Sequence, residues 1–421
     1  MRVAVIGAGV AGLGAAIALS ERPQTSVALF EKEGTLGGHA HTIDVDYDGR
    51  KIAVDTGFIV YNELNYPNFT QLLRWAGVET LASDMSFSLS CSDGAFEWAG
   101  RDTRPVSGLF AQRRNAFSPR FLLFLNAVRR FQERALADMA SGAIGEETLG
   151  DYIAARGFGA DLRDNYVAPM GAAIWSMSQD ETLDFPARAF LNFFENHRLL
   201  HWKRPVWRTV AGGSRSYVAV LQEKLGACVR LAAPVRAVRR TEGGVMLQLH
   251  DGAVEQFDAA ILATHAPTAL ALLTDATDEE RRVLGAFRVS ANTVVVHRNA
   301  GLMPKRREAW ASWNVLRRNR AARPAVTYWM NRLQSIPEST PLFITLNPDR
   351  DIAPEAVFAE RAYDHPLYDA AAFAAQARLP QIQKGAIRFA GAWTGYGFHE
   401  DGLRSGISAA QAFDGGAPWP Q

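Results

Sequence analysis

The apolar positions at the start of the chain follow a strand, helix, strand order. Residues 2–7 are a short run of Val, Ala and Ile, which predicts a buried strand. Residues 10–20 are rich in Ala and Leu and predict a helix, and residues 27–31 form a second apolar strand. Three such elements in about 30 residues predict a right-handed crossover with parallel strands.

The same kind of pattern returns twice further along the chain. Gly212-Gly213-Ser214 opens an expected helix that runs to Leu225, and residues 229–236, 245–250 and 259–263 are expected strands. Near the end, residues 387–390 predict a strand and residues 403–413 a helix. Residues 337–354 and 415–421 are expected to be loops.

The segments between these pieces have a different character. Residues 68–200 are rich in aromatic side chains and helical patterns, and residues 289–346 contain several β-rich runs. At 421 residues the chain exceeds the roughly 250 to 300 residues at which single cores stop growing, so we expect two domains. We predict an α/β, Rossmann-like domain from residues 1–67, 205–288 and 385–421, with an inserted α+β substrate domain from residues 68–204 and 289–384.

A glycine-rich loop joins the first expected strand to the first helix. Gly7-Ala8-Gly9-Val10-Ala11-Gly12 matches the dinucleotide fingerprint in the position where backbone amides and the helix dipole favour a pyrophosphate. Gly7 allows the tight turn, Gly9 the close approach of the ligand, and Gly12 the packing of helix on strand. The pattern predicts that Gly7, Ala8, Gly9, Ala11 and Gly12 bind a dinucleotide.

A carboxylate supports dinucleotide binding, and a second glycine turn indicates FAD rather than NAD. Glu31, followed by Lys32, ends the second strand about 20 residues beyond the glycines, where its carboxylate can accept hydrogen bonds from a ribose diol. A second glycine turn, Leu36-Gly37-Gly38-His39, would bring backbone close to the pyrophosphate and the ribityl chain, which an NAD domain does not need. Thr56-Gly57 supplies another tight turn nearby.

The C-terminal segment adds a strand, a loop and a helix with a face of small residues. Gly391-Ala392 follows the expected strand, and Gly402-Leu403 opens the expected helix. The N-terminus of such a helix can hold the negative charge that a reduced flavin develops.

These three elements, in this order, resemble the flavin amine oxidase and phytoene desaturase superfamily over the whole chain. The resemblance implies that Val235 pairs its backbone with adenine and that Ala263 lies near the dinucleotide. Two positions depart from the family pattern: His39 stands where Arg is usual, and Ala392 where an acid commonly binds ribityl hydroxyls.

The resemblance also bears on the chemistry. Related monoamine oxidases often attach FAD through a C-terminal Cys, but no Cys follows Cys228, so we expect non-covalent FAD. The motif match places His399 where an amine oxidase carries a cage tyrosine. We therefore expect His399 and Glu400, in the loop before the final helix, to face substrate, with a histidine of near-neutral pKa taking a proton as hydride leaves. The alternative is that His399 only bonds backbone in that loop.

Within the superfamily, the chain is most similar to bacterial NAD/FAD-binding amine oxidase-like proteins, some of which act on methylated unsaturated acyl chains of phospholipids. Tyr61-Asn62, residues 170–175 and the His399 loop carry this similarity. It implies dehydrogenation of such a chain, as in furan fatty acid synthesis. Amine or amino-acid oxidation is the competing hypothesis, and a non-catalytic flavin-dependent binding protein is the third.

Charge and composition narrow the range of partners. The formal net charge of +1 provides no global field for nucleic acid, so none is expected as a partner. An apolar helix at 117–125, bordered by Arg113-Arg114 and Arg129-Arg130, would lie in an anionic lipid interface or be a buried helix with solvated ends. Two distant cysteines indicate a reducing compartment, so we expect a cytoplasmic protein, with the inner face of the cytoplasmic membrane as the site of any contact through 113–130. No metal is expected, because His39 and His41 lie within the ribityl turn, and His197 and His201 have no carboxylate in a zinc-protease arrangement.

Overall fold

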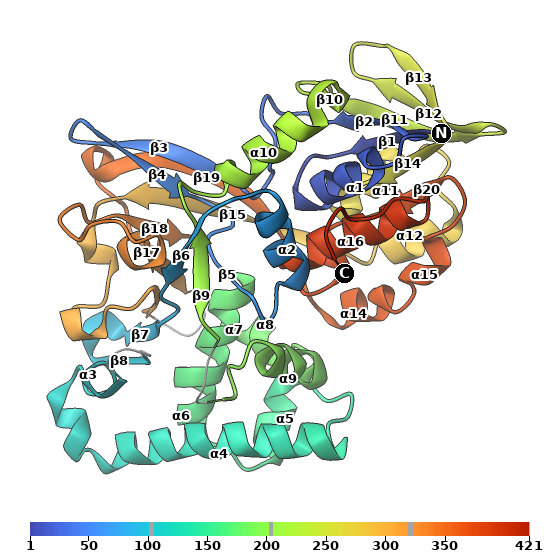
Figure 1. Cartoon of the computed structure of the whole chain (residues 1–421). Coiled ribbons are helices and arrows are strands. Elements are labelled where there is room, and N and C mark those ends of the chain that lie inside the picture. Colours follow the sequence, from blue (N-terminus) through green and yellow to red (C-terminus); the bar gives the residue numbers. More distant parts are fainter. Residues whose placement is uncertain (101–104, 202–204, 319–323, 421) are drawn as a thin grey trace.

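The computed structural model describes residues 1–420 except 101–104, 202–204 and 319–323. A parallel sheet of strand order β10-β2-β1-β14-β20 lies in the upper right part of Figure 1, in the half of the molecule that holds both chain termini. Its strands come from three distant segments of the chain: β1 (Arg2–Ile6), β2 (Ser26–Phe30), β10 (Val229–Arg230), β14 (Ala259–Leu262) and β20 (Ile387–Phe389).

Alternate residues of β1 face two different cores, as the two-residue period of a strand requires. Val3 and Val5 pack with α1 (Val10–Ser20), α10 (Arg215–Leu225) and α16 (His399–Gln411), whereas Ala4 and Ile6 face the opposite core. That second core is closed by these elements: β11 (Val235–Thr241), β12 (Gly244–Leu249), β13 (Val254–Phe257), α11 (Ala266–Leu272), α12 (Asp278–Leu284), α14 (Ala370–Gln376) and α15 (Leu379–Ile382).

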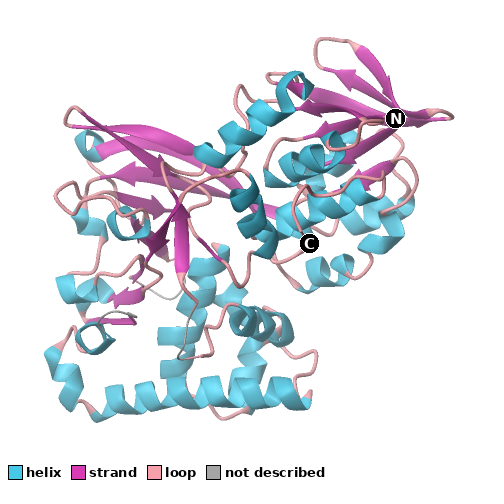
Figure 2. Cartoon of the chain, viewed as in Figure 1, coloured by secondary structure: helices cyan, strands magenta, loops and turns pink. Residues whose placement is uncertain are grey.

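A second, larger sheet with strand order β19-β15-β18-β17-β16-β7-β8 occupies the other half of the molecule (Figure 2). Its strands are β7 (Phe87–Cys91), β8 (Phe96–Gly100), β15 (Arg288–His297), β16 (Trp313–Arg317), β17 (Ala325–Trp329), β18 (Phe343–Leu346) and β19 (Val357–Leu367). Smaller sheets are formed by β3 (Thr42–Tyr47) with β4 (Arg50–Asp55), and by β5 (Tyr61–Asn62), β9 (Trp207–Val210) and β6 (Thr80–Ser83).

Helices cover the lower part of the second half, with α4 running along the lower edge in Figure 1. None of the helices in the described residues is long and apolar enough to cross a membrane. The helices outside the parallel-sheet region are α2 (Pro67–Trp75), α3 (Pro105–Leu109), α4 (Pro119–Ser141), α5 (Leu149–Ala155), α6 (Ala160–Leu162), α7 (Ala168–Trp175), α8 (Gln179–Leu183), α9 (Ala187–Asn196) and α13 (Met330–Leu333).

Three sequence predictions are corrected by the structure. The single strand expected at 229–236 is two strands, β10 and β11, which belong to different sheets because positive φ at Ala232 turns the chain between them. The loop expected at 337–354 contains β18, which is buried between β15 and β17. The last helix begins at His399 rather than at Leu403.

Candidate functional site

The first glycine turn has the geometry that the fingerprint predicts. Gly7 has a φ of +95°, and a Cβ there would lie 2.7 Å from the Ala263 carbonyl oxygen, so only glycine fits between β1 and β14. A Cβ on Gly12 would lie 1.8 Å from the Gly7 oxygen, which fixes the close packing of helix on turn. At Gly9, by contrast, a Cβ would meet no atom within 4 Å, so protein packing does not explain this glycine. Gly9 therefore fits a position where a ligand approaches the N-terminus of α1.

Glu31 ties this turn to the end of β2. Its buried carboxylate accepts hydrogen bonds from the backbone amides of Ala8 (2.8 Å) and Glu33 (3.0 Å), and its carbonyl accepts from Ala233 (2.9 Å). The latter contact places the start of β11, with the half-buried Val235, beside the same turn. Lys32, in contrast, points into solvent and pairs with Glu33 at 3.6 Å.

The second glycine turn joins the first directly. Gly37 donates its amide to the Ala8 oxygen (2.9 Å), and Gly38 approaches Gly9 so closely that an added Cβ would lie 3.1 Å from its Cα. Both glycines have positive φ, at +113° and +58°. The sequence prediction that these two turns form one site is consistent with this packing.

Gly57 completes the loop through His39. A Cβ on Gly57 would lie 2.2 Å from the His39 carbonyl oxygen, which accepts the amide of Phe58 at 2.8 Å. The hydroxyl of the neighbouring Thr56 is hydrogen-bonded to His41, which is in turn hydrogen-bonded to Arg361. Because Arg361 can only donate, His41 accepts its hydrogen bond at Nε2 (2.7 Å) and donates from Nδ1 to Thr56 Oγ1 (2.9 Å).

The C-terminal segment packs against the fingerprint helix. A Cβ on Gly406 would lie 2.0 Å from the Ala11 carbonyl oxygen, and one on Gly402 would lie 2.8 Å from Val10 Cγ1. Gly391 donates its amide to Ser405 Oγ at 2.9 Å, which holds the turn carrying the half-buried Ala392 beside α16. The buried Leu403 lies against Gly14 of α1, so α1 and α16 begin side by side.

Five predicted positions on the first glycine turn, the two glycines of the second turn and the predicted positions of the C-terminal segment thus converge at one place. The donors available there are backbone amides at the start of a helix, and the acceptor is the Glu31 carboxylate, a set that suits a pyrophosphate and a ribose diol. The residues fit FAD, which would be held by Gly7, Ala8, Gly9, Ala11, Gly12, Glu31, Gly37, Gly38, His39, Thr56, Gly57, Val235, Ala263, Gly391, Ala392, Gly402 and Leu403.

His399 is the first residue of α16 and is buried. Its Nε2 lies 2.7 Å from the hydroxyl of Tyr217, and its ring stacks on Phe58 with centroids 3.8 Å apart. Burial, assisted by repulsion from His39, lowers the pKa of His399 to about 3, so the imidazole is neutral at pH 7. The expectations that His399 lies in a loop and that its pKa is near neutral are both wrong, and its hydrogen-bond partner in the structure is a tyrosine side chain.

Glu400 also lies in the first turn of α16 rather than in a loop. Its carboxylate accepts from the amides of Asn68 (3.1 Å) and Phe69 (2.9 Å) and from Asn68 Nδ2 (2.7 Å), at the start of α2. Burial nevertheless raises the pKa of Glu400. Helix α16 starts four residues before the predicted start at Leu403. The carboxylate of Asp401 accepts hydrogen bonds from the amides of Tyr396 (2.9 Å) and Phe398 (3.1 Å) and so caps the N-terminus of the helix.

Sequence reasoning missed a cluster of neutral histidines beside this site. The ring of His39 lies 5.8 Å from that of His365, 5.9 Å from that of His265 and 5.1 Å from that of Tyr363. Burial and the mutual repulsion of the imidazoles lower the pKa of His39 to about 3 and that of His365 to about 4, and burial also lowers the pKa of His265. The available signal was the two-residue spacing of Tyr363 and His365, which puts both on one face of β19.

An aromatic wall adjoins the histidine cluster. His365 Nδ1 lies 3.0 Å from Ser176 Oγ. Ser176 follows Trp175, the last residue of α7, so this contact places Trp175 beside the histidines. Trp175 donates from Nε1 to the Tyr396 oxygen at 3.4 Å and contacts Phe193, which stacks on Phe398 at 4.9 Å. The loop that leads into α16 is thereby lined with apolar rings.

Comparisons with known proteins agree with this geometry. A family model for flavin containing amine oxidoreductase matches residues 10–296. A putrescine oxidase solved with putrescine bound has a TM-score of 0.70 at 16% identity, covering 98% of this chain and 99% of that one. A CLA-producing fatty acid isomerase from P. acnes (TM-score 0.66) and a cyclohexylamine oxidase from Brevibacterium oxydans IH-35A (TM-score 0.67) are each 16% identical, with 98% of both chains covered. No curated protein sequence matches the chain.

Because the solved structures are only 16% identical to this chain, their similarity concerns the fold and not the activity. They confirm the amine oxidase-type FAD-binding architecture. The family match covers more than half of the chain and agrees with the converging glycine turns and Glu31. The protein is an FAD-dependent oxidoreductase and belongs to the flavin-containing amine oxidoreductase family.

Proposed function

We propose that the protein dehydrogenates an apolar acyl chain, specifically a methylated unsaturated fatty acyl chain of a phospholipid. The observation that carries the proposal is the aromatic wall of Trp175, Phe193 and Phe398 beside neutral histidines. Such a lining suits an uncharged chain, because apolar surface is removed from water when the chain enters.

The acidic side chains in the first turn of α16 do not favour an ammonium substrate. Glu400 is bonded to the start of α2, and Asp401 to the amides of Tyr396 and Phe398 as well as to Arg404 at 2.8 Å. Carboxylates occupied in this way are poor partners for a buried cation. Amine oxidation, which the family name suggests, is therefore the second candidate.

The reaction removes a hydride and a proton from adjacent or conjugated positions, and a new carbon–carbon double bond forms next to the methyl branch. FAD, held by the two glycine turns and Glu31, would supply the acceptor for the hydride, and O2 or a quinone would be the final acceptor of the electrons. The proton goes to a base beside the flavin site, for which the sequence assigns either the neutral imidazole of His399 or the carboxylate of Glu400. The low pKa of His399 supports a neutral ring at pH 7 but makes it a weak base.

Flavin absorbance of the purified protein, titrated under anaerobic conditions, tests the proposal. We expect a lipid with methylated unsaturated acyl chains to bleach the flavin, while polyamines and aromatic amines leave it oxidised. Bleaching by amines alone would replace the proposal with amine oxidation. Retention of oxidised flavin with every lipid and amine, together with a stable protein complex, would support a non-catalytic binding protein.

The role of His399 requires a paired comparison. His399→Gln should slow flavin reduction by about 10²-fold or more with FAD retained, since positioned proton acceptors contribute roughly that factor. Tyr217→Phe removes the same hydrogen bond but leaves the imidazole in place. Equal losses in the two variants would make His399 a positioning residue, and an unchanged rate in His399→Gln would move the proton to the cluster of His39.

A further inference from the structure

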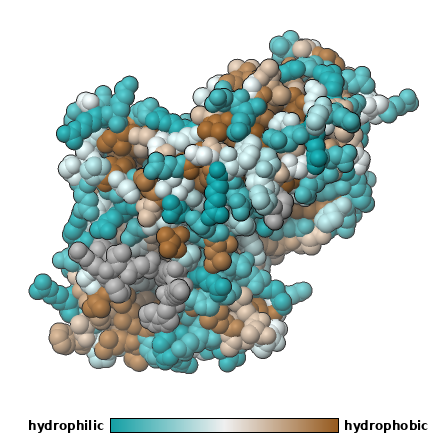
Figure 3. All heavy atoms as spheres, in the orientation of Figure 1, coloured by the Kyte–Doolittle hydropathy of each residue, from teal (hydrophilic) through white to brown (hydrophobic). Residues whose placement is uncertain are grey.

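Exposed apolar side chains gather on one segment at the lower edge of the molecule. Val106 on α3 is 67% exposed, Phe117 88%, and Leu122 and Leu123 on α4 47% and 68%. Figure 3 shows brown surface along this edge, over the region where α3 and α4 lie in Figure 1. Side chains this large are rarely exposed together on a soluble surface without a partner.

The exposure is fixed by the packing of α4. Ser118 caps the helix by accepting the amide of Phe121, and the buried rings of Phe121 and Phe124 lie 6.0 and 6.2 Å from that of Phe96. Helical periodicity then turns Leu122 and Leu123 away from the core. The sequence left open whether this helix is buried or lies in a lipid interface; in the structure one face of the helix is buried and the other carries exposed apolar residues.

Cations flank the apolar residues and are only partly neutralised. Arg120 pairs with Asp161 at 2.6 Å and Arg129 with Glu133 at 2.7 Å. Arg114 bonds only to the Ala95 carbonyl, and Arg113 has no acidic partner among the residues that the structure describes. The positive charge at this edge is therefore local, because the whole chain has a net charge of only +1.

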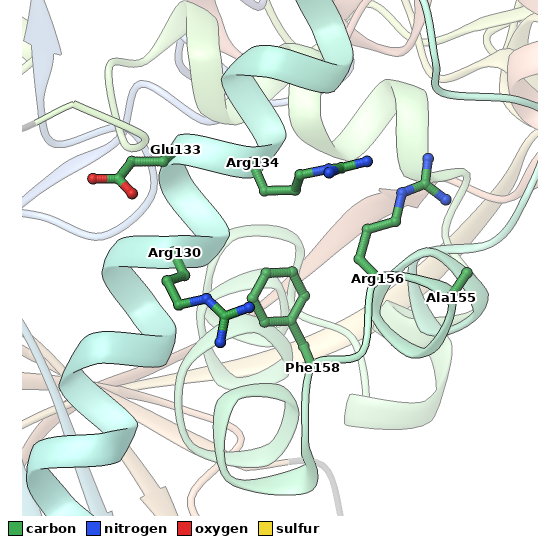
Figure 4. A pocket seen from close by; sticks show the side chains of 6 residues that line it. All are labelled: Arg130, Glu133, Arg134, Ala155, Arg156 and Phe158. Atoms are coloured by element: carbon green, nitrogen blue, oxygen red, sulfur yellow. The ribbon is translucent and has the colours of Figure 1, made fainter.

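A basic hollow lies two turns further along the same helix face. Its volume is about 510 Å³, and it is lined by three arginines and one acid, Arg130, Arg134, Arg156 and Glu133, together with Ala155 and Phe158 (Figure 4). The carboxylate of Glu133 is paired with Arg129. Arg134 and Arg156 share the buried Asp138 at 2.8 and 3.0 Å, whereas Arg130 has no carboxylate partner within the described part of the chain. The hollow thus keeps a cationic wall that can meet an anionic headgroup.

We propose that this edge docks on an anionic phospholipid bilayer, with Val106, Phe117, Leu122 and Leu123 entering the interface and Arg113, Arg114 and Arg130 contacting phosphates. Apolar side chains that protrude beside unneutralised cations match the order of layers at a lipid surface, where acyl chains lie below phosphates. The proposal rests on the proposed function for its purpose, since a bilayer is where phospholipid acyl chains are found.

Sedimentation of the FAD-loaded protein with vesicles tests the docking without any turnover. Vesicles of phosphatidylcholine alone are compared with vesicles that also contain phosphatidylglycerol. We expect binding to the anionic vesicles, weakened by salt, and a loss of about tenfold or more in the double variant Phe117→Ser/Leu123→Ser. Arg113→Gln/Arg130→Gln should weaken binding to anionic vesicles by about tenfold and leave binding to phosphatidylcholine unchanged.

Val254→Ser provides the matched control, because Val254 is comparably exposed, at 56%, but lies on β13 in the other half of the molecule. It should bind vesicles as the unmodified protein does. Failure of the unmodified protein to bind anionic vesicles would overturn the docking proposal, as would equal binding by Phe117→Ser/Leu123→Ser and Val254→Ser. A dimer that the double variant converts to a monomer, with no vesicle binding, would instead assign this edge to a second copy of the chain.

Failure of docking and failure of the proposed function are separable. A detergent-dispersed lipid with methylated unsaturated chains should bleach the flavin equally in the unmodified protein and in Phe117→Ser/Leu123→Ser. Vesicle binding without bleaching would leave the docking proposal standing and overturn the proposed substrate.

Discussion

At the scale of single residues, Glu31 makes the contact most open to test. Its carboxylate already accepts the amides of Ala8 and Glu33 and is positioned to accept a ribose diol as well. We expect Glu31→Gln to weaken FAD binding by about 10- to 100-fold, because hydrogen bonds to a charged acceptor contribute roughly 1.5 to 3 kcal/mol. Titration of the apoprotein with FAD, followed by flavin fluorescence, measures this.

Glu33→Gln is the control for that change, since Glu33 is exposed and, among the described residues, its carboxylate pairs only with Lys32. Equal FAD affinity in Glu31→Gln and the unmodified protein would remove Glu31 from the cofactor site. Excess FAD should restore much of the thermal stability of Glu31→Gln, because a ligand stabilises the folded state by mass action.

Residues whose role depends on backbone geometry were predictable from the sequence. Gly7, Gly12 and Glu31 follow from a motif with fixed spacing, and the structure places them as that motif requires. The environments of His39 and His365 were not predictable. Their low pKa values arise from burial and from imidazoles that lie 100 residues or more away in the chain, which no local pattern records.

At the scale of elements, the contact of α1 with α16 joins the two ends of the chain. A Cβ on Gly406 would lie 2.0 Å from the Ala11 oxygen, a backbone atom that cannot move without shifting α1. We expect Gly406→Ala to lower the free energy of unfolding by about 1 to 3 kcal/mol, as for other overpacked sites, and to reduce bound FAD. Urea denaturation and the flavin-to-protein absorbance ratio give the two readouts.

Gly34→Ala is the matched control, because a Cβ at Gly34 would meet no atom within 4 Å. It should change neither quantity. A Gly406→Ala variant as stable as Gly34→Ala would mean that α1 and α16 separate easily.

Element types were predicted better than element ends. β1, α1 and the strand at β20 lie where the apolar pattern put them, since their local periodicity agrees with their burial. The start of α16 was placed four residues too late, because Gly402 resembled a helix boundary and the cap at Asp401 depends on a side chain folding back. β19 was not recognised, since exposed polar residues interrupt its alternation.

At the scale of the whole molecule, burial of histidines links folding to pH. Burial lowers the pKa of His39 and His399 to about 3 and that of His197, His297 and His365 to about 4. In the unfolded chain these histidines bind a proton near pH 6.5, whereas in the folded protein they stay neutral until the pH approaches 4 or 3. The contribution of the neutral histidines to the free energy of unfolding is therefore complete above about pH 6.5 and is lost as the pH falls toward 4 and 3. Asp55 acts in the opposite sense, because burial raises its pKa to about 6 and favours folding at acid pH.

The histidines outnumber Asp55, so the free energy of unfolding should fall as the pH is lowered from 7 to 5, by up to about 1.4 kcal/mol per pH unit for each buried histidine. His297 isolates one of them, because it lies in β15 and is fixed as a neutral ring by accepting the Asn299 amide at Nδ1 and donating from Nε2 to Thr345. His297→Gln should reduce the slope of stability against pH by the contribution of one proton, whatever its effect on stability at pH 7. Urea denaturation at pH 7, 6 and 5 measures both slopes, and equal slopes would mean that His297 is not kept neutral by the fold.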